Sequence, residues 1–203
     1  MSMSRSGPRS AGMLIGRFTA VLDACVLHPG FVRGALLWCA AERLFRPLWS
    51  AQILDEWQRS LERKFPDARP EQLAAQRRLM EAQFDDAMVA GHEPLIEALT
   101  LPDPDDRHVL AAAITGHADA IVTANLKDFP KDVIARFSVE VIHPDDFLVN
   151  AIDLDTQRAL TALRRHREAL SQSTPTSADY LIRLERCGMI QTHQRLQGLV
   201  ELL

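Results

Sequence analysis

Two neighbouring segments of the chain gather acidic and amide side chains in a pattern that could bind a metal ion. Residues 103–113 read DPDDRHVLAAA and place three aspartates before an apolar helical stretch. Residues 120–129 read AIVTANLKDF, in which Asn125 and Asp128 follow a short apolar run. Carboxylates gathered without a basic partner repel one another, and a divalent cation commonly holds them together. The two segments therefore predict helix and strand ends that converge on a cation.

Two further acids lie upstream. Residues 17–27 read RFTAVLDACVL, an apolar run that predicts a strand ending at Asp23. Asp23 could cap the following turn, but a carboxylate in such a run is costly to bury unless it is paired or metal-bound, which favours a functional role. Glu56 lies beside the apolar stripe of a helix that Ser50 is expected to cap. Taken alone, Glu56 would be interpreted as a solvated surface residue.

The elements that must position these acids alternate between strand and helix. We expect the other strands at 44–49, 120–123 and 139–142, and helices at 31–44, from 50 onward, at 69–90 and at 104–116. Asp105 or Asp106 would cap the last of these helices, and Gly116 would end it. This alternation predicts an α/β fold with a parallel sheet, in which ligands collect at the carboxyl ends of the strands.

The character of the chain changes near residue 150, where strand patterns stop. Helical patterns cover 153–170 and 178–202, with a break near Gly188 and a Ser/Thr/Pro linker at 171–177. We therefore expect a disordered tail at 1–16, an α/β domain at 17–148 and an all-helical extension at 149–203. The extension would pack on the main domain, exchange with a neighbour or receive a partner.

Composition narrows the class of protein. The 203 residues are 47% apolar and 25% charged, and three cysteines at unrelated spacings argue against disulfides or a zinc site. A signal peptide and a membrane span are not expected, so the prediction is a soluble protein of the cytoplasm. The net charge of −4 argues mildly against a large nucleic-acid footprint. Clustered acids add to that charge, however, and a bound divalent ion would reverse its local sign.

Four motifs in order resemble those of PIN-domain nucleases, and specifically VapC-type toxin ribonucleases of type II toxin-antitoxin systems. They are VLDACVL at 21–27, SAQILDEW at 50–57, DPDDRHVLAAA at 103–113 and IVTANLKDF at 121–129. The resemblance covers about residues 17–148. No single motif is diagnostic, but four in the same order make a specific pattern.

The resemblance implies a PIN-like, Rossmann-like parallel sheet flanked by helices and a metal-dependent endoribonuclease that hydrolyses RNA phosphodiester bonds. Carried over by motif, Asp23, Glu56 and Asp106 would be catalytic metal ligands, with Asp128 a fourth acid acting through water. Their hard oxygen atoms suit Mg²⁺ or Mn²⁺. The resemblance also implies an RNA substrate, a cognate antitoxin and a homodimer.

Several assignments stay open at this point. Either Asn125 or Asp128 could complete the metal site, Asp105 could be only a helix cap, and Thr123 could either support a metal ligand or satisfy the end of its strand. The histidines, His108 among them, do not pair at metal-ligand spacing. Arg107, Lys127 and Lys131 flank the acidic loops and could contact an RNA backbone.

Competing functions differ in their support. A phosphotransferase of the haloacid-dehalogenase type would require a second acid two residues after Asp23, where this chain has Cys25. A PIN-like scaffold that binds RNA or a partner without turnover would be expected to lose core acids, whereas all four are present. It remains the alternative, because acids alone do not prove turnover.

Overall fold

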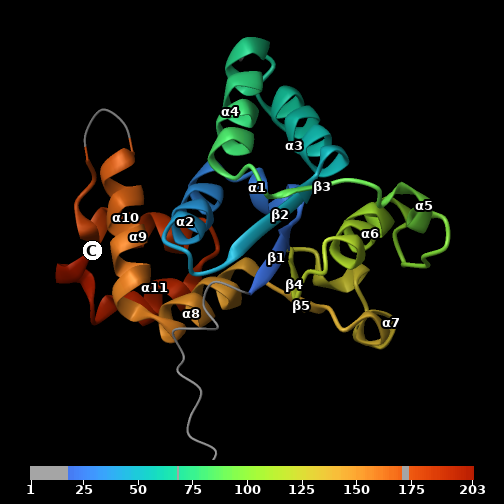
Figure 1. The fold of residues 1–203 in the computed structure, drawn as a ribbon. Helices are drawn as coiled ribbons and strands as arrows, with labels where there is room; N and C mark the ends of the chain where they lie inside the picture. The colour runs from blue at the N-terminus through green and yellow to red at the C-terminus, as the bar shows by residue number, and fades with distance from the viewer. Residues whose placement is uncertain (1–17, 68, 171–173) are drawn as a thin grey trace, which may run out of the picture.

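The fold is built on a five-stranded parallel sheet in a computed structural model that describes residues 18–67, 69–170 and 174–203 (Figure 1). The predicted tail at 1–16 lies outside these residues. The strand order is β3-β2-β1-β4-β5. The strands are β1 Thr19–Leu22, β2 Arg46–Ser50, β3 Met88–Val89, β4 Ala120–Val122 and β5 Glu140–Ile142. The predicted α/β class with a parallel sheet is confirmed.

The first strand occupies the centre of the sheet. Val21 lies in register with Leu48 of β2 on one side and with Ile121 of β4 on the other. All four residues of β1 are buried, which explains why this strand is a continuous apolar run rather than an alternating one. The strand order reverses between β1 and β4, so the loops that follow these two strands border the crevice in which parallel sheets bind ligands.

Helices cover the sheet and extend beyond its edge. The short helix α1 spans Ala24–Leu27, α2 Gly30–Ala41, α3 Ala51–Lys64, α4 Pro70–Gln83, α5 Glu93–Ile96, α6 Arg107–Thr115 and α7 Lys131–Ile134. Single 3-10 turns, labelled η, occupy Pro104–Asp106 (η2), Leu126–Asp128 (η3) and Ala135–Phe137 (η4). Helix α6 packs across β1, β2 and β4, whereas α3 and α4 lie side by side and project away from the sheet (Figure 1).

Two helix boundaries show how local sequence and packing combine. Ser50 caps α3 as expected, since its side chain accepts a hydrogen bond from the backbone N–H of Ile53. Gly116 follows α6 as expected, but its φ of −78° does not require glycine. A Cβ atom there would lie 2.7 Å from Leu48 and 2.9 Å from Val89, so close packing against the sheet explains the glycine.

One local prediction was wrong, and a second was met only in part. The helix predicted over 69–90 ends at Gln83, and the following segment forms β3, the edge strand beside β2. Asp106 occupies the N-cap position of α6, one of the two positions expected, but its side chain makes no capping hydrogen bond. Instead, Asp103 caps the preceding turn η2 by accepting a hydrogen bond from the Asp105 N–H at 2.9 Å.

The chain after the sheet is helical in its described residues. These helices are α8 Pro144–Leu154, α9 Thr156–Ala169, α10 Ser177–Arg186 and α11 Ile190–Gln197, followed by the 3-10 turn η5 Val200–Leu202. Helix α8 runs across the boundary predicted at 148/149, and α9 packs along α2. In that contact Phe31 meets the buried pair His166 and Tyr180, which are joined by a 2.9 Å hydrogen bond.

Two observations complete the fold. Gly188 breaks the last helical stretch with a φ of 82°, as its position in the sequence predicted. Among the helices of the described residues, none has the length and apolar character needed to cross a membrane. The C-terminal all-helical region that follows the sheet agrees with the predicted fold class.

Candidate metal centre

Asp23 directly follows the central strand, where the sequence predicted it. Its backbone N–H still donates to Val122 of the neighbouring strand at 3.1 Å, and its φ and ψ of −68° and 153° keep the chain extended before α1 begins. The side chain is only 5% exposed. The end of β1 therefore holds a carboxylate at the switch point of the sheet, where an unpaired charge is costly.

Two donors hold one oxygen of this carboxylate. Thr123 Oγ1 donates to Asp23 Oδ2 at 2.7 Å, and Cys25 Sγ donates to the same oxygen at 3.0 Å. Burial, followed by the charge of Asp23, raises the pKa of Cys25 to about 12, so its thiol stays neutral and can donate. Sequence reasoning missed this role of Cys25; its place two residues after Asp23 was the available signal.

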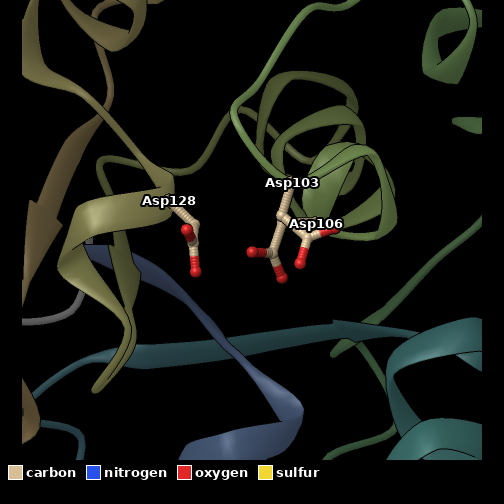
Figure 2. Close-up of side chains that lie close together, drawn as sticks. All are labelled: Asp103, Asp106 and Asp128. Atoms are coloured by element: carbon tan, nitrogen blue, oxygen red, sulfur yellow. The ribbon is translucent and has the colours of Figure 1, made fainter.

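Three further aspartates meet across the crevice. Asp103 precedes η2, Asp106 ends it, and Asp128 ends η3 after β4. One carboxylate oxygen of each lies within 4.8 Å of the others. Figure 2 shows the Asp128 carboxylate facing the other two from the opposite side of a gap. Sequence analysis selected Asp106 and Asp128 but did not select Asp103 as a ligand, because the η2 turn that brings it beside Asp106 was not predicted.

The electrostatics of this acid cluster, Asp103, Asp106 and Asp128, are unfavourable without a cation. Burial raises the pKa of Asp106 to about 7, with further increases from the charges of Asp23, Asp103 and Asp128. Asp106 Oδ2 is buried and has no hydrogen-bond partner among the described residues. Over the same residues, no lysine or arginine lies within ion-pair distance of the cluster or of Asp23. This all-oxygen donor set suits a hard divalent cation such as Mg²⁺ or Mn²⁺.

Glu56 reaches the same edge of the sheet from α3 but lies outside the acid cluster. Its Oε1 atom is 2.9 Å from Nε2 of His108, a residue of α6 that is only 1% exposed. The carboxylate remains 32% exposed and lines a cleft together with Cys25 and Asp105. Sequence reasoning set His108 aside, because its neighbour Glu56 is 52 residues away and only the packing of α3 against α6 joins them.

The loop after β4 arranges the residues whose roles were left open. The Asn125 side-chain amide donates to Asp128 Oδ2, and the Asn125 backbone N–H donates to Thr123 Oγ1 at 3.0 Å. Thr123 is fully buried, and its hydrogen bond to Asp23 links this loop to the end of β1. Asp128 reaches the acid cluster with Asn125 as its donor, whereas Asp105 is exposed and lines the adjacent cleft.

Comparisons with known proteins agree with this geometry. The family model of the PIN domain matches residues 19–127, just over half of the 203 residues, and that of the VapC50 C-terminal domain matches 144–198. A protein of Mycobacterium tuberculosis (strain ATCC 25618 / H37Rv), named "Putative ribonuclease VapC50", is 46% identical over 68 residues.

That similarity covers 34% of this chain and 40% of the mycobacterial protein, so the matched stretch spans less than half of the relative. No solved structure matches this chain. The PIN-domain match begins at the first residue of β1 and ends within η3, so it contains Asp23, Glu56, Asp103 and Asp106 and stops one residue before Asp128. The chain belongs to the PIN-domain family, and its helical C-terminal region matches the VapC50 C-terminal domain.

Proposed function

We propose that the protein is a metal-dependent endoribonuclease that hydrolyses RNA phosphodiester bonds. The observation that carries this proposal is the buried, unpartnered Oδ2 atom of Asp106 inside a cluster of acids at the switch point of a PIN-domain sheet. Burying such an oxygen without a partner is unfavourable, so its retention indicates a ligand role. The name of the mycobacterial relative, a ribonuclease, supports the reaction class.

We assign the catalytic and metal-binding roles to Asp23, Glu56, Asp106 and Asp128. Asp103 joins this set on the geometry, since its carboxylate lies within the acid cluster. When bound, Mg²⁺ or Mn²⁺ would activate a water molecule and neutralise charge on the phosphate as the P–O bond breaks. These ions keep water and phosphate oxygens among their ligands. A site next to a cleft, which Glu56 lines, leaves room for such ligands.

The remaining side chains position these acids. Thr123 and Cys25 fix the Asp23 carboxylate through Oδ2, and Asn125 holds Asp128. His108 is buried against Glu56 and restricts the direction in which that carboxylate can turn. Such supporting contacts commonly change metal affinity or activity by about 10- to 100-fold.

We further propose that the protein acts as the toxin of a type II toxin-antitoxin system in the cytoplasm. The match to a VapC50 C-terminal domain supports this placement. A cognate antitoxin would then be its protein partner, and a homodimer its expected assembly. Purification from the native operon tests the partner: an antitoxin should copurify, and recovery of the protein without a bound small protein would count against this role.

Cleavage of RNA by the purified protein tests the enzymatic proposal. Total bacterial RNA is incubated with Mg²⁺, with Mn²⁺ or with EDTA, and the fragments are separated on a denaturing gel. We expect cleavage that requires metal and that is lost in Asp23→Asn and Glu56→Gln. Glu185→Gln, at an exposed position of α10, should cleave normally. Cleavage in EDTA, or full activity of Asp23→Asn, would refute the mechanism, and binding of RNA without any cleavage would favour the scaffold.

A further inference from the structure

A cleft of about 810 Å³ adjoins the proposed metal centre and contains groups that the mechanism does not use. Cys25 and Asp105 line it on the side of the acids, and α3 forms its other wall with Glu56, Arg59 and Arg63. The cleft therefore joins the proposed catalytic carboxylates to two guanidinium groups. An RNA strand whose cleaved phosphate lies at the acids has neighbouring phosphates that must also be accommodated.

The spacing along α3 places these three side chains on one face. Glu56, Arg59 and Arg63 stand at positions i, i+3 and i+7, which an α-helix brings into line. With a rise of about 1.5 Å per residue, the two arginines lie about 4.5 and 10.5 Å from Glu56 along the helix axis. Positive charge thus begins about one turn from the proposed catalytic acid and continues for another turn along the same wall.

Both arginines are available to bind a ligand. They are exposed, and neither forms an ion pair with another described residue. By contrast, Arg77 on the neighbouring helix α4 is held between Asp55 and Glu81. Glu62 also lines the cleft, but its carboxylate accepts a 3.2 Å hydrogen bond from the side chain of Gln58 on the same helix.

We propose that Arg59 and Arg63 bind backbone phosphates of the RNA strand next to the phosphate that is cleaved. This inference rests on the proposed ribonuclease function and adds the path of the strand along α3. Arginine suits the role because its planar guanidinium can make two parallel hydrogen bonds to a phosphate. In a chain of net charge −4, attraction for RNA must come from such local groups.

The sequence had pointed instead to the cations that flank the acidic loops. Arg107 is engaged elsewhere, since its Nε donates to the backbone oxygen of Pro104 at 2.9 Å. Lys131 lines a different cavity, formed with residues near β5. The two arginines of α3 are separated in sequence from the aspartate motifs, and only the fold brings them to the same cleft.

The salt dependence of RNA binding tests this assignment. A fluorescein-labelled, mixed-sequence, single-stranded RNA is titrated with protein in Mg²⁺, and anisotropy is recorded over a series of NaCl concentrations. All proteins carry Asp23→Asn to prevent cleavage, and Arg59→Gln, Arg63→Gln and the double substitution are compared with this parent. Arg186→Gln is the matched control, because Arg186 is exposed on α10, outside the cleft.

We expect each substitution to weaken binding by about tenfold at low salt. The slope of log K against log [NaCl] should become shallower by about 0.7 for each lost phosphate contact on a single strand, whereas Arg186→Gln should match the parent. Unchanged slopes and affinities in the double variant would overturn the inference even if the wild-type protein cleaves RNA. Absence of cleavage by the wild-type protein would overturn the proposed function and this inference together.

Discussion

Two aspartates, Asp145 in the C-terminal helical region and Asp106 in the candidate metal centre, differ in how their carboxylates are satisfied. Asp145, at the start of α8, is 3% exposed, and its carboxylate accepts hydrogen bonds from the backbone N–H groups of Gln191 and Thr192 and from the Thr192 hydroxyl, at 2.7–2.8 Å. Asp106 has a buried oxygen without a described partner, and burial, followed by the charges of three neighbouring acids, raises the pKa of its carboxyl. Hydrogen bonds within the protein satisfy the Asp145 carboxylate, whereas the Asp106 oxygen requires a partner from outside the protein.

This difference separates an acid that stabilises the protein from one that is kept for function. Asp145 joins α8 to the first turn of α11, where a carboxylate also complements the helix dipole. The acids near Asp106 repel one another in the absence of a cation, so they lower stability unless a ligand is bound. Substitution of Asp106 should therefore mainly change activity, and substitution of Asp145 should mainly change stability.

The largest expected effect is on RNA cleavage. Asp106→Asn should lower kcat/KM by about 10³-fold, because the loss of a metal-binding carboxylate removes several kcal/mol of charge stabilisation. Asp145→Asn should retain most of the activity when assayed below its Tm, since it lies outside the crevice. Rates on total bacterial RNA at saturating Mg²⁺ measure both variants. Equal losses of activity would show that the two acids do not differ in the way proposed.

The next largest effect is on stability. Here we expect substitution of Asp145 to have the larger effect and substitution of Asp106 the smaller one. Asp145→Ala leaves the donors from Gln191 and Thr192 unpaired and should lower the free energy of unfolding by about 3 kcal/mol. For a chain of this size, that corresponds to a fall in Tm of about 6–12 °C. Asp106→Ala should not lower the Tm of the metal-free protein. Thermal unfolding in EDTA, followed by circular dichroism, compares them, and a stable Asp145→Ala would contradict the assignment.

Loss of the hydroxyl group that supports Asp23 should have a smaller effect, which is on metal binding. Thr123→Val keeps the shape of the side chain but removes the hydroxyl that donates to Asp23 Oδ2. We expect Mn²⁺ affinity to fall by about 10- to 100-fold. Thr123→Ser keeps the donor and serves as the control. If titration calorimetry gives the same affinity for Thr123→Val as for the wild type, this hydroxyl only satisfies the end of β4.

The smallest effect concerns the pH dependence of metal-free stability. The folded state raises the pKa of Asp106 from 3.8 to about 7, so its contribution to stability is complete below pH 3.8 and is lost as pH rises through about 7. Asp106→Asn removes this loss and should raise the Tm in EDTA at pH 8 by a few degrees, since ~1 kcal/mol corresponds to about 2–4 °C.

The gain from Asp106→Asn should be much smaller at pH 4, where the wild-type carboxyl is largely protonated in the folded state. Melting curves of the two proteins at both pH values provide the measurement. A Tm of Asp106→Asn that falls below that of the wild type at pH 8 in EDTA would show that this carboxylate stabilises the metal-free fold.

Much of the central fold was predictable because its signals are local. The apolar run that ends at Asp23 predicted β1, and the side chain of Ser50 caps α3. By contrast, β3 has only two residues and exists because Trp49 and Ser50 of β2 offer a partner for pairing. Neither residue of β3, Met88 or Val89, ends the helical pattern of the preceding sequence, so the helix was predicted too long.

The residues of the candidate site likewise fall into those with a local sequence signal and those that depend on tertiary packing. Asp23 and Asp128 could be singled out because each follows an expected strand, whereas Asp106 was preferred to its neighbouring aspartates on the resemblance to the family motif. The contribution of Asp103 depends on the η2 turn, and the contact of His108 with Glu56 depends on how α3 packs against α6. These features follow from tertiary packing, which the spacing of residues within one element does not report.

The most direct test of the metal centre is Mn²⁺ binding, measured by titration calorimetry on the wild-type protein, Asp106→Asn and Asp145→Asn at pH 8. If the acid cluster is a cation site, the wild type should bind Mn²⁺, Asp106→Asn should bind it at least tenfold more weakly, and Asp145→Asn should match the wild type. Equal binding by the wild type and Asp106→Asn, or no binding by the wild type, would contradict the proposed role of these acids.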